Sequence, residues 1–314
     1  MSRILITGAG GYVGQQLAAA LARDHHVVGM DIRPAPATLA GQVTWWQKDI
    51  RDAELAALMA EEGIEQVVHL AAVLEDSGDR QRDFDIDVNG TANVLAACVS
   101  SQVRQVVVTS SGAAYGYHAD NPAWLTETDP LRGNQEFPYA DHKRQVEELL
   151  STYRDTHPEL KQLVLRVGTV LGAQTNNQIT RLFTAKRLIK IRGADSPFVF
   201  IWDQDLLGII DQGVRQQQAG IFNVAGDGAL TVNQLARMMR KPVMTVPASV
   251  LKAALWIGCR LGLSRHAPEQ VNFLRYRPVL DNQQLKLSFG YVPQKTSQQV
   301  FEYYLLHARQ RGML

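Results

Sequence analysis

Cysteine is scarce in this chain, which has two in 314 residues, Cys98 and Cys259. Because they lie far apart and form no C-x-x-C pair, the sequence supports neither a disulfide framework nor a zinc ribbon. The motifs H-E-x-x-H and G-x-S-x-G are also missing, so metalloprotease and serine-hydrolase chemistry have no support and we expect no metal site. Scarce cysteine favours a reducing compartment, and we expect a cytoplasmic protein.

The chain also lacks a strong charge of either sign and a long apolar run. A net charge of +1 gives no electrostatic footprint for nucleic acid or an anionic membrane, so we expect a small-molecule substrate as the partner. The most apolar stretch, residues 250–263, contains Lys252 and Arg260 and is too short to span a bilayer. We interpret it as a buried helix or a pocket lid, with a membrane-surface helix as the alternative. The first residues do not have the pattern of a signal peptide, and none is expected.

What the chain does have is a glycine-rich turn in residues 4–17, ILITGAGGYVGQQL. The dinucleotide pattern G-x-G-x-x-G fails at Val13, but the register Gly8, Gly11, Gly14 fits. An apolar strand precedes this turn and an Ala- and Leu-rich helix follows it. Glycine lets the backbone approach a ligand, and the helix N-terminus suits a pyrophosphate.

A glycine turn alone is often only a turn, but the next strand adds the missing context. It ends at Asp31, about 20 residues past the glycines, where a carboxylate accepts hydrogen bonds from both ribose hydroxyls. This carboxylate would repel a 2′-phosphate, so NAD is predicted over NADP. Arg33 lies close enough to soften that preference.

Strands and helices alternate along the first half of the chain. Such alternation predicts an α/β fold with a doubly wound parallel sheet of the Rossmann type, in which ligands bind beyond the carboxyl ends of the strands. The predicted strands are 43–47, 66–70, 105–109 and 162–167, and the predicted helices are 53–62, 83–100 and 139–153.

The pattern changes past residue 171. We predict a helix over 179–190, a strand over 198–201, a helix from about Asp205, a strand over 221–224 and a mainly helical remainder. The predicted NAD-binding Rossmann domain is 1–172, completed by about 198–225. The predicted smaller, mainly helical substrate lobe comprises 173–197 and 226–314, with the substrate between the two.

Three residues form a candidate catalytic set. Tyr139 and Lys143 are four residues apart on a predicted helix and therefore share one face. An ammonium group beside a phenol favours the phenolate, which makes the tyrosine a proton donor and acceptor. Ser111 follows the strand VVVTS and is placed to hold the substrate oxygen. Helical phase predicts that His142 points away from this cleft.

The sequence resembles the extended short-chain dehydrogenase/reductase superfamily, specifically its NAD-dependent epimerase/dehydratase group, which includes UDP-glucose 4-epimerase. The resemblance covers nearly the whole chain. Its motifs are TGAGGYVG at 7–14, Asp31, DIRD at 49–52, HLAA at 69–72, VNGT at 88–91, SSGAAYG at 110–116, Tyr139 with Lys143, LRVGTVLG at 165–172 and FNVAG at 222–226.

The resemblance implies NAD as cofactor and Ser111, Tyr139 and Lys143 as catalytic residues. A homodimer is possible, and no membrane span is expected. The implied cofactor contacts come from the strand ends, the glycine turn and the catalytic helix: Gly8, Gly11, Tyr12, Val13, Gly14, Asp31, Ile32, Arg33, Asp49, Ile50, Leu70, Ala71, Ala72, Asn89, Ser110, Tyr139, Lys143 and Arg166.

Departures from the group bear on the substrate. Sugar-nucleotide members usually carry a diphosphate-binding arginine where this chain has Ser196 and Pro197, and Arg275 or Arg277 is a candidate substitute. A basic set at 187, 190 and 192 is another. Gly112 follows the serine where a dehydratase has an acidic residue, which disfavours dehydration.

The resulting hypothesis is an NAD-dependent oxidoreductase or epimerase acting at a secondary alcohol or ketone carbon of a sugar or sugar nucleotide. Two alternatives stay open: an NAD(P)H-dependent reductase or dehydrogenase of a non-nucleotide ketone or alcohol, and a non-catalytic NAD-sensing protein. Four aromatic residues are candidate pocket walls that can equally belong to the core: Tyr115, Trp124, Phe183 and Trp202.

Overall fold

The computed structural model describes residues 1–75, 77–260, 268 and 271–314. Contacts divide the chain into two interleaved compact units. Unit 1 comprises Met1–Ser111, His142–Arg166 and Asp203–Phe222, and unit 2 comprises Gly112–Asp141, Val167–Trp202 and Asn223–Leu314. Residues 112–141 therefore group with the second unit, whereas the sequence placed them in the first domain. The boundaries of the predicted NAD-binding domain and substrate lobe remain a prediction.

The main sheet has seven strands in the order β10-β6-β5-β4-β1-β2-β3. Registered neighbours run parallel, and the order reverses between β1 and β4, the place where doubly wound sheets bind ligands. The predicted α/β Rossmann fold is confirmed. The strands are β1 Arg3–Thr7, β2 His26–Asp31, β3 Thr44–Gln47, β4 Gln66–His69, β5 Gln105–Ser111, β6 Lys161–Val167 and β10 Gly220–Val224.

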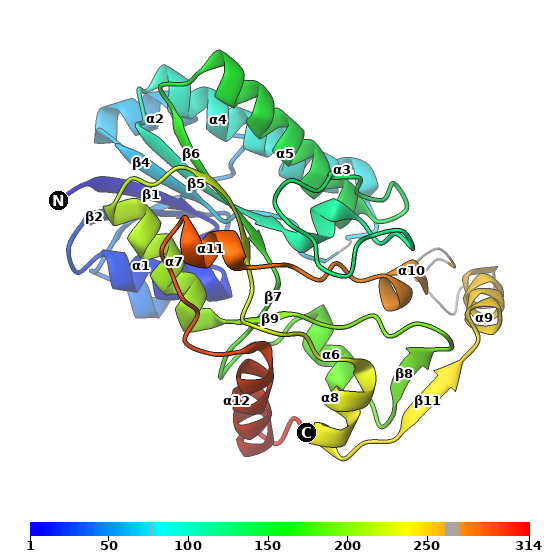
Figure 1. The fold of residues 1–314 in the computed structure, drawn as a ribbon. Helices are drawn as coiled ribbons and strands as arrows, with labels where there is room; N and C mark the ends of the chain where they lie inside the picture. The colour runs from blue at the N-terminus through cyan, green and yellow to red at the C-terminus, as the bar shows by residue number, and fades with distance from the viewer. Residues whose placement is uncertain (76, 261–267, 269–270) are drawn as a thin grey trace. The chain divides into compact units, whose positions relative to one another are not determined.

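Helices cover both faces of this sheet. Helices α1 (Tyr12–Leu21) and α7 (Asp203–Arg215) pack together on one face, and α2 (Leu55–Glu62), α4 (Gly90–Ser100) and α5 (Pro138–Thr156) cover the other (Figure 1). Because both faces are covered, the inner strands are near-continuous apolar runs: four of the five residues of β1 are buried. This burial fixes the strand ends that carry the candidate site.

Two predicted helices of unit 1 have different bounds from those expected. The helix predicted over 83–100 is instead α3 (Arg80–Phe84), a π-helical turn (Asp85–Asn89) and α4. The helix predicted over 53–62 begins at Leu55, although Gly63 ends it as expected with a left-handed φ of +67°. π-helical turns are frequent at functional sites, and this one contains the VN of the VNGT motif.

Unit 2 is built on two small parallel sheets and a helical core. Strand β7 (Thr169–Leu171) pairs with β9 (Phe200–Trp202), and β8 (Leu188–Ile191) pairs with β11 (Val243–Val246). The prediction of one helix over 179–190 was wrong, because α6 (Gln178–Thr184) ends early and β8 follows. The other helices are α8 (Val232–Met239), α9 (Ala248–Arg260), α10 (Val271–Arg275), α11 (Gln283–Leu287) and α12 (Ser297–Gln310).

The aromatic residues predicted as pocket walls divide between core and surface. Phe183 is fully buried and packs against Phe200 and Phe301, while Tyr115 is fully buried and donates to Asn223. Both are core residues rather than pocket walls. Trp124 is 45% exposed and lines a pocket of unit 2 with Asp281 and Lys286, as predicted for a pocket wall.

The apolar stretch at 250–263 is the largest departure from the sequence-based interpretation. Helix α9 contains no buried residue, so the prediction of a buried helix was wrong for its described part. Residues 261–263 lie outside the described residues. No helix among the described residues is long and apolar enough to cross a membrane.

Candidate active site

The glycine turn joins β1 to α1 in unit 1. Gly8 has a left-handed φ of +68°, and a Cβ there would lie 2.8 Å from the Ala71 backbone nitrogen. A Cβ on Gly14 would collide with the Gly8 carbonyl oxygen. The N-cap residue Gly11 has no side chain that could cap the helix, and the first turn of α1 has no acidic residue, so the helix N-terminus suits a phosphate group. The turn therefore fits the pyrophosphate of a dinucleotide.

Asp31 lies at the carboxyl end of β2 and is buried beside this turn. Its Oδ2 accepts from the Gly10 backbone N–H at 3.0 Å, and its Oδ1 accepts from the Arg33 N–H at 3.0 Å and the Arg33 Nε at 2.9 Å. The second guanidinium nitrogen of Arg33 reaches Oδ2 at 3.1 Å. Burial by itself would raise the pKa of Asp31, but the hydrogen bonds from Arg33 and Gly10 outweigh it and hold that pKa below its ordinary value. The carboxylate is therefore ionised at neutral pH.

The end of β3 and the π-helical turn are joined by an ion-pair network. Arg51 contacts Asp49 at 2.7 Å and Asp85 at 2.6 Å, and Asn89 donates to Asp85 at 2.9 Å. These bonds lower the pKa of both carboxyls. The hydrogen bond from Arg51 has the largest effect on the pKa of Asp49, and the hydrogen bond from Asn89 has the largest effect on that of Asp85. The network fixes Asp49, which with the neighbouring Ile50 is among the predicted cofactor contacts. Their contact with the cofactor stays a prediction.

Strand β5 and helix α5 supply the candidate catalytic residues. Ser111 is the last residue of β5, and α5 carries both Tyr139 and Lys143. Lys143 is buried in unit 1 and its Nζ donates to the Thr109 carbonyl at 2.9 Å, which fixes the ammonium group at the end of β5. Tyr139 packs in unit 2 against the buried cluster of Ala113, Tyr117 and Ala140, as Phe137 and Phe273 also do.

Two residues predicted to contact the cofactor are bound to a buried carboxylate. Ser110 Oγ donates to Glu147 Oε1 at 2.5 Å, and Arg166 pairs with Glu147 at 2.7 Å. All three side chains are buried. These bonds to Glu147 join the end of β5 to β6. Direct contact of Ser110 or Arg166 with the cofactor remains a prediction.

A buried hydrogen-bond chain crosses the strand ends beside Lys143. His69 contacts Thr7 Oγ1 through Nδ1 at 2.7 Å and Thr91 Oγ1 through Nε2 at 3.0 Å. Thr91 donates its proton to the Asp87 carbonyl at 2.5 Å, so it must accept from His69, which in turn accepts from Thr7. Burial and then the charge of Lys143 lower the pKa of His69 to about 3. His69 is therefore a neutral Nε2–H tautomer that ties β1 to the π-helical turn.

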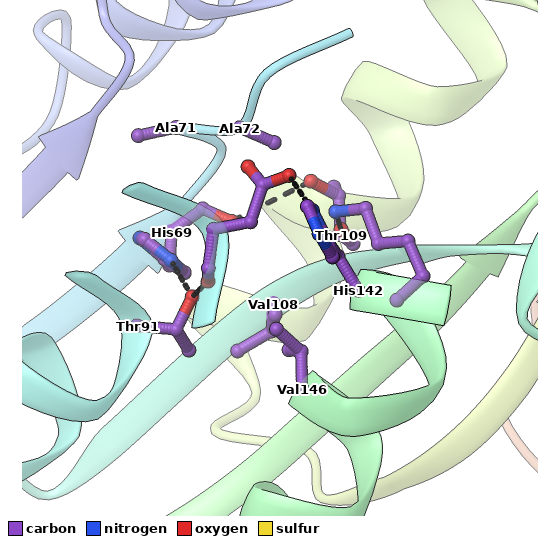
Figure 2. A pocket seen from close by; sticks show the side chains of 10 residues that line it. His69, Ala71, Ala72, Thr91, Val108, Thr109, His142 and Val146 are labelled. Carbon is purple, nitrogen blue, oxygen red and sulfur yellow. Dashed lines mark hydrogen bonds and ion pairs between the residues drawn. The ribbon is translucent and has the colours of Figure 1, made fainter. Parts of the chain in front are cut away.

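His69, Thr91 and Lys143 line a small cavity, which also contains a pair, Asp87 and His142, that sequence analysis missed. Asp87 Oδ2 contacts His142 Nδ1 at 2.9 Å, and Asp87 Oδ1 accepts from the Val73 backbone N–H at 2.7 Å. In Figure 2, His69 and Thr91 meet on one side of the cavity and His142 lies on the other. Sequence analysis predicted that His142 points away from the substrate cleft, and the structure places it in this cavity beside Lys143, where it pairs with Asp87. The available signal was Asp87, directly before the VNGT motif, together with a histidine next to the candidate catalytic Lys143.

Tyr12 opens α1 and is bonded within unit 1. Its hydroxyl donates to Asp203 Oδ2 at 2.5 Å, which links the glycine turn to the start of α7.

The glycine turn, the ionised Asp31 and the fixed Lys143 together fit a nicotinamide dinucleotide. The turn suits the pyrophosphate, Asp31 can accept from ribose hydroxyls, and Lys143 places a cation at the end of β5. Among the described residues, no cluster of three or more His, Cys, Asp or Glu could hold a metal ion.

In unit 2, Arg277 lies beside Ser196, the position at which the family resemblance predicts a diphosphate-binding arginine. Arg277 donates to the Ser196 carbonyl at 2.8 Å and to its hydroxyl at 3.0 Å. Its guanidinium lies 3.8 Å from the Phe198 ring centroid and 4.8 Å from that of Phe273. Burial lowers the pKa of Arg277 to about 9, so it stays cationic at neutral pH. Its Nε is buried and has no hydrogen-bond partner.

Known proteins match the chain in sequence. A model described as the NAD dependent epimerase/dehydratase family matches residues 4–203. An uncharacterized protein of Mycobacterium tuberculosis is 26% identical over 323 residues, which cover 99% of this chain and 84% of that protein. A UDP-glucose 4-epimerase of Neisseria meningitidis serogroup A is 30% identical over 193 residues, which cover 57% of this chain and 56% of that protein.

Solved structures match the whole fold. The UDP-glucose 4-epimerase of Thermotoga maritima, crystallised with UDP-glucose, has a TM-score of 0.76 at 19% identity and covers 98% of this chain and 99% of its own. The UDP-glucose 4-epimerase of Thermus thermophilus, crystallised with NAD, has a TM-score of 0.76 at 23% identity with the same coverage. At these identities the likeness is one of fold.

The sequence motifs, the fold and the family match agree with one another. The resemblance stated from the motifs is confirmed, and so is NAD as the cofactor. The chain belongs to the NAD-dependent epimerase/dehydratase family and is an NAD-dependent enzyme of the short-chain dehydrogenase/reductase type.

Proposed function

We propose that this enzyme moves a hydride between NAD and a secondary alcohol or ketone carbon of a sugar nucleotide, with epimerisation through a transient ketone as the net reaction. Bound NAD supplies the hydride acceptor and, in the return step, the hydride donor. The protein supplies the proton transfer and the binding of both partners.

In this proposal Tyr139 is the general acid and base. Its phenolate takes the hydroxyl proton as the carbonyl forms and returns it when the alcohol re-forms. The ammonium of Lys143, held by the Thr109 carbonyl, stabilises the phenolate. Ser111 donates a hydrogen bond to the reacting oxygen. These roles rest on the motif positions and on the anchored Lys143.

Arg277 is the observation that carries the sugar-nucleotide assignment. Its guanidinium is fixed by Ser196 and two aromatic rings, yet its buried Nε has no partner. A buried donor without a partner costs about 1–3 kcal/mol, which an anionic ligand would recover. A guanidinium is the natural partner of a diphosphate. Arg277, which is hydrogen-bonded to Ser196, thus takes the place of the diphosphate-binding arginine that the chain lacks at position 196.

The test is UDP binding measured by calorimetry. Arg277→Met should weaken UDP binding at least tenfold and leave NADH binding unchanged, because Met keeps the apolar packing and removes the charge. Arg311→Met, which removes an exposed arginine of the same unit, is the matched control and should bind UDP like the wild type. Undetectable binding of UDP and UDP-sugars by the wild type at millimolar concentration would reject the assignment.

A second candidate is a dehydrogenase of a non-nucleotide alcohol or ketone. The surroundings of Tyr139 favour it, because Phe137, Tyr117, Phe273 and Tyr276 form an aromatic cluster there. A dehydrogenase must exchange its cofactor in every turnover, whereas an epimerase gains by retaining it. Protein purified without added cofactor and then denatured should therefore release near-stoichiometric NAD if it is an epimerase.

A further inference from the structure

The net charge of +1 conceals a segregation of charge along the sequence. Residues 173–194 and 228–268 together contain 11 Lys and Arg and no Asp or Glu. The remaining 251 residues carry 21 Lys and Arg against all 31 Asp and Glu. One part of the chain is therefore strongly basic while the rest is acidic.

The described residues of these basic segments all belong to unit 2. Strands β8 and β11 pair, α8 packs against both strands, and α9 starts two residues after β11 ends (Figure 1). Lys190 is neutralised by Asp195, and Lys241 donates to two backbone carbonyls. The exposed basic side chains are Arg181, Lys186, Arg187, Arg192, Arg237, Arg240 and Arg260.

Helix α9 presents an apolar face to solvent beside these charges. Val250 is 56% exposed and Ile257 is 51% exposed, and exposed Ala253 and Ala254 lie between them at helical spacing. Trp256 is 53% exposed, and the Arg260 guanidinium lies 4.7 Å from its ring centroid. A helix with no fully buried residue gains little packing energy from its apolar side chains in water. Such a face marks an interaction surface.

The same character continues onto the adjoining strands. Ile189 of β8 and Met244 of β11 are registered partners on neighbouring strands, and they are 40% and 42% exposed. An exposed apolar pair thus accompanies the apolar helix within the basic region.

We propose that the α9 surface, meaning α9 with Ile189 and Met244, docks this enzyme on an anionic lipid bilayer. A short helix with apolar residues and a tryptophan exposed to solvent, in a stretch of sequence that is rich in basic residues and contains no acidic ones, has the character of a helix lying in a bilayer interface. Each Lys or Arg near an anionic surface strengthens binding roughly fivefold. At about 20 Å in length α9 lies on the bilayer and does not cross it.

Two other occupants fit the observations less well. A second copy of the chain would bring one basic region against another, which costs binding energy. RNA would use the charges but would leave Val250, Trp256 and Ile257 in water. An anionic bilayer uses both features.

Vesicle co-sedimentation of the full chain tests the proposal. We expect binding to vesicles of phosphatidylcholine with roughly one-third phosphatidylglycerol and at least tenfold weaker binding to phosphatidylcholine alone. Raising the salt from about 0.1 M to about 0.5 M should weaken the binding, because exposed charges become screened.

Two paired variants separate the two contributions. Trp256→Gln with Ile257→Gln should reduce binding at least tenfold, because it removes the tryptophan and one of the more exposed aliphatic side chains of the surface. Arg187→Gln with Arg192→Gln should reduce it roughly twentyfold or more. The matched controls are Leu306→Gln, which removes an exposed apolar side chain of α12, and Arg104→Gln, which removes an exposed charge of unit 1. Unchanged NADH affinity and thermal midpoint in each variant show that the fold is intact.

Three outcomes would overturn the proposal. The first is wild-type protein that does not distinguish anionic from neutral vesicles. The second is binding that depends on the arginines but not on Trp256 and Ile257, which would indicate a purely electrostatic surface. The third is a dimer, seen by sedimentation velocity, that the Trp256 and Ile257 variant converts to monomer, since α9 would then join two copies.

Discussion

Replacing Arg33 with alanine should strengthen NADH binding, although it removes a residue that the sequence places at the cofactor. In the structure the Asp31 carboxylate accepts four hydrogen bonds, from the Gly10 N–H, the Arg33 N–H and two nitrogens of the Arg33 guanidinium. A carboxylate has about four acceptor positions, so none is left for a ribose hydroxyl. The two backbone bonds are fixed by the turn. The two guanidinium bonds must therefore break before both hydroxyls can bind.

The size of the effect follows from the exposure of the pair. The Arg33 side chain is 60% exposed, which puts its pairing with Asp31 at no more than about 1 kcal/mol. Removing this competition should tighten NADH binding up to about fivefold. NADPH should bind at least tenfold more weakly, because a charge-assisted bond to its 2′-phosphate is worth about 1.5 kcal/mol or more. The preference for NADH over NADPH should thus increase by at least about tenfold, and by about fiftyfold if NADH binding tightens fivefold.

Calorimetric titration of NADH and NADPH into the wild type and Arg33→Ala measures both effects. Arg104→Ala is the control, since it removes an arginine of similar exposure elsewhere in unit 1. A clear loss of NADH affinity in Arg33→Ala, with NADPH affinity unchanged, would refute the competition and show that Arg33 binds the shared part of the cofactor.

Three further predictions concern the candidate catalytic residue and the cavity beside it. Tyr139→Phe should abolish most turnover while NADH affinity stays within about twofold, because it removes a proton-transfer group and no binding charge; near wild-type kcat would contradict this role. Asp87→Ala should lower the free energy of unfolding in urea by about 3 kcal/mol, since it breaks a buried pair with His142, whereas Asp87→Asn should lower it less. His69 has its pKa lowered to about 3 in the folded state, so unfolding binds a proton and stability falls with decreasing pH between about 6.5 and 3, by up to about 1.4 kcal/mol per pH unit. In that window His69→Asn should flatten the pH dependence of unfolding, and an unchanged slope would show that other groups dominate.

The glycine turn and the strand ends could be predicted from the sequence because they follow local rules. The turn needs a left-handed backbone at position 8, which glycine tolerates best, and apolar strands that alternate with helices are typical of a parallel sheet. Both signals lie within a few residues of each other in the sequence. Tyr139 and Lys143 were placed on one helix by their spacing alone. The bounds of the helix at 80–100 were not predicted, because a π-helical turn leaves no periodic signal of its own.

The sequence by itself determined the Rossmann fold, NAD as cofactor and the chemical types of the candidate residues, because these depend on local pattern. Tertiary structure decided which distant groups meet. Asp87 and His142 are 55 residues apart, and Arg277 is 81 residues from Ser196, so no local pattern pairs them. It also decided that α9 is exposed, since an apolar helix is the same in sequence whether the fold covers it or leaves it in water.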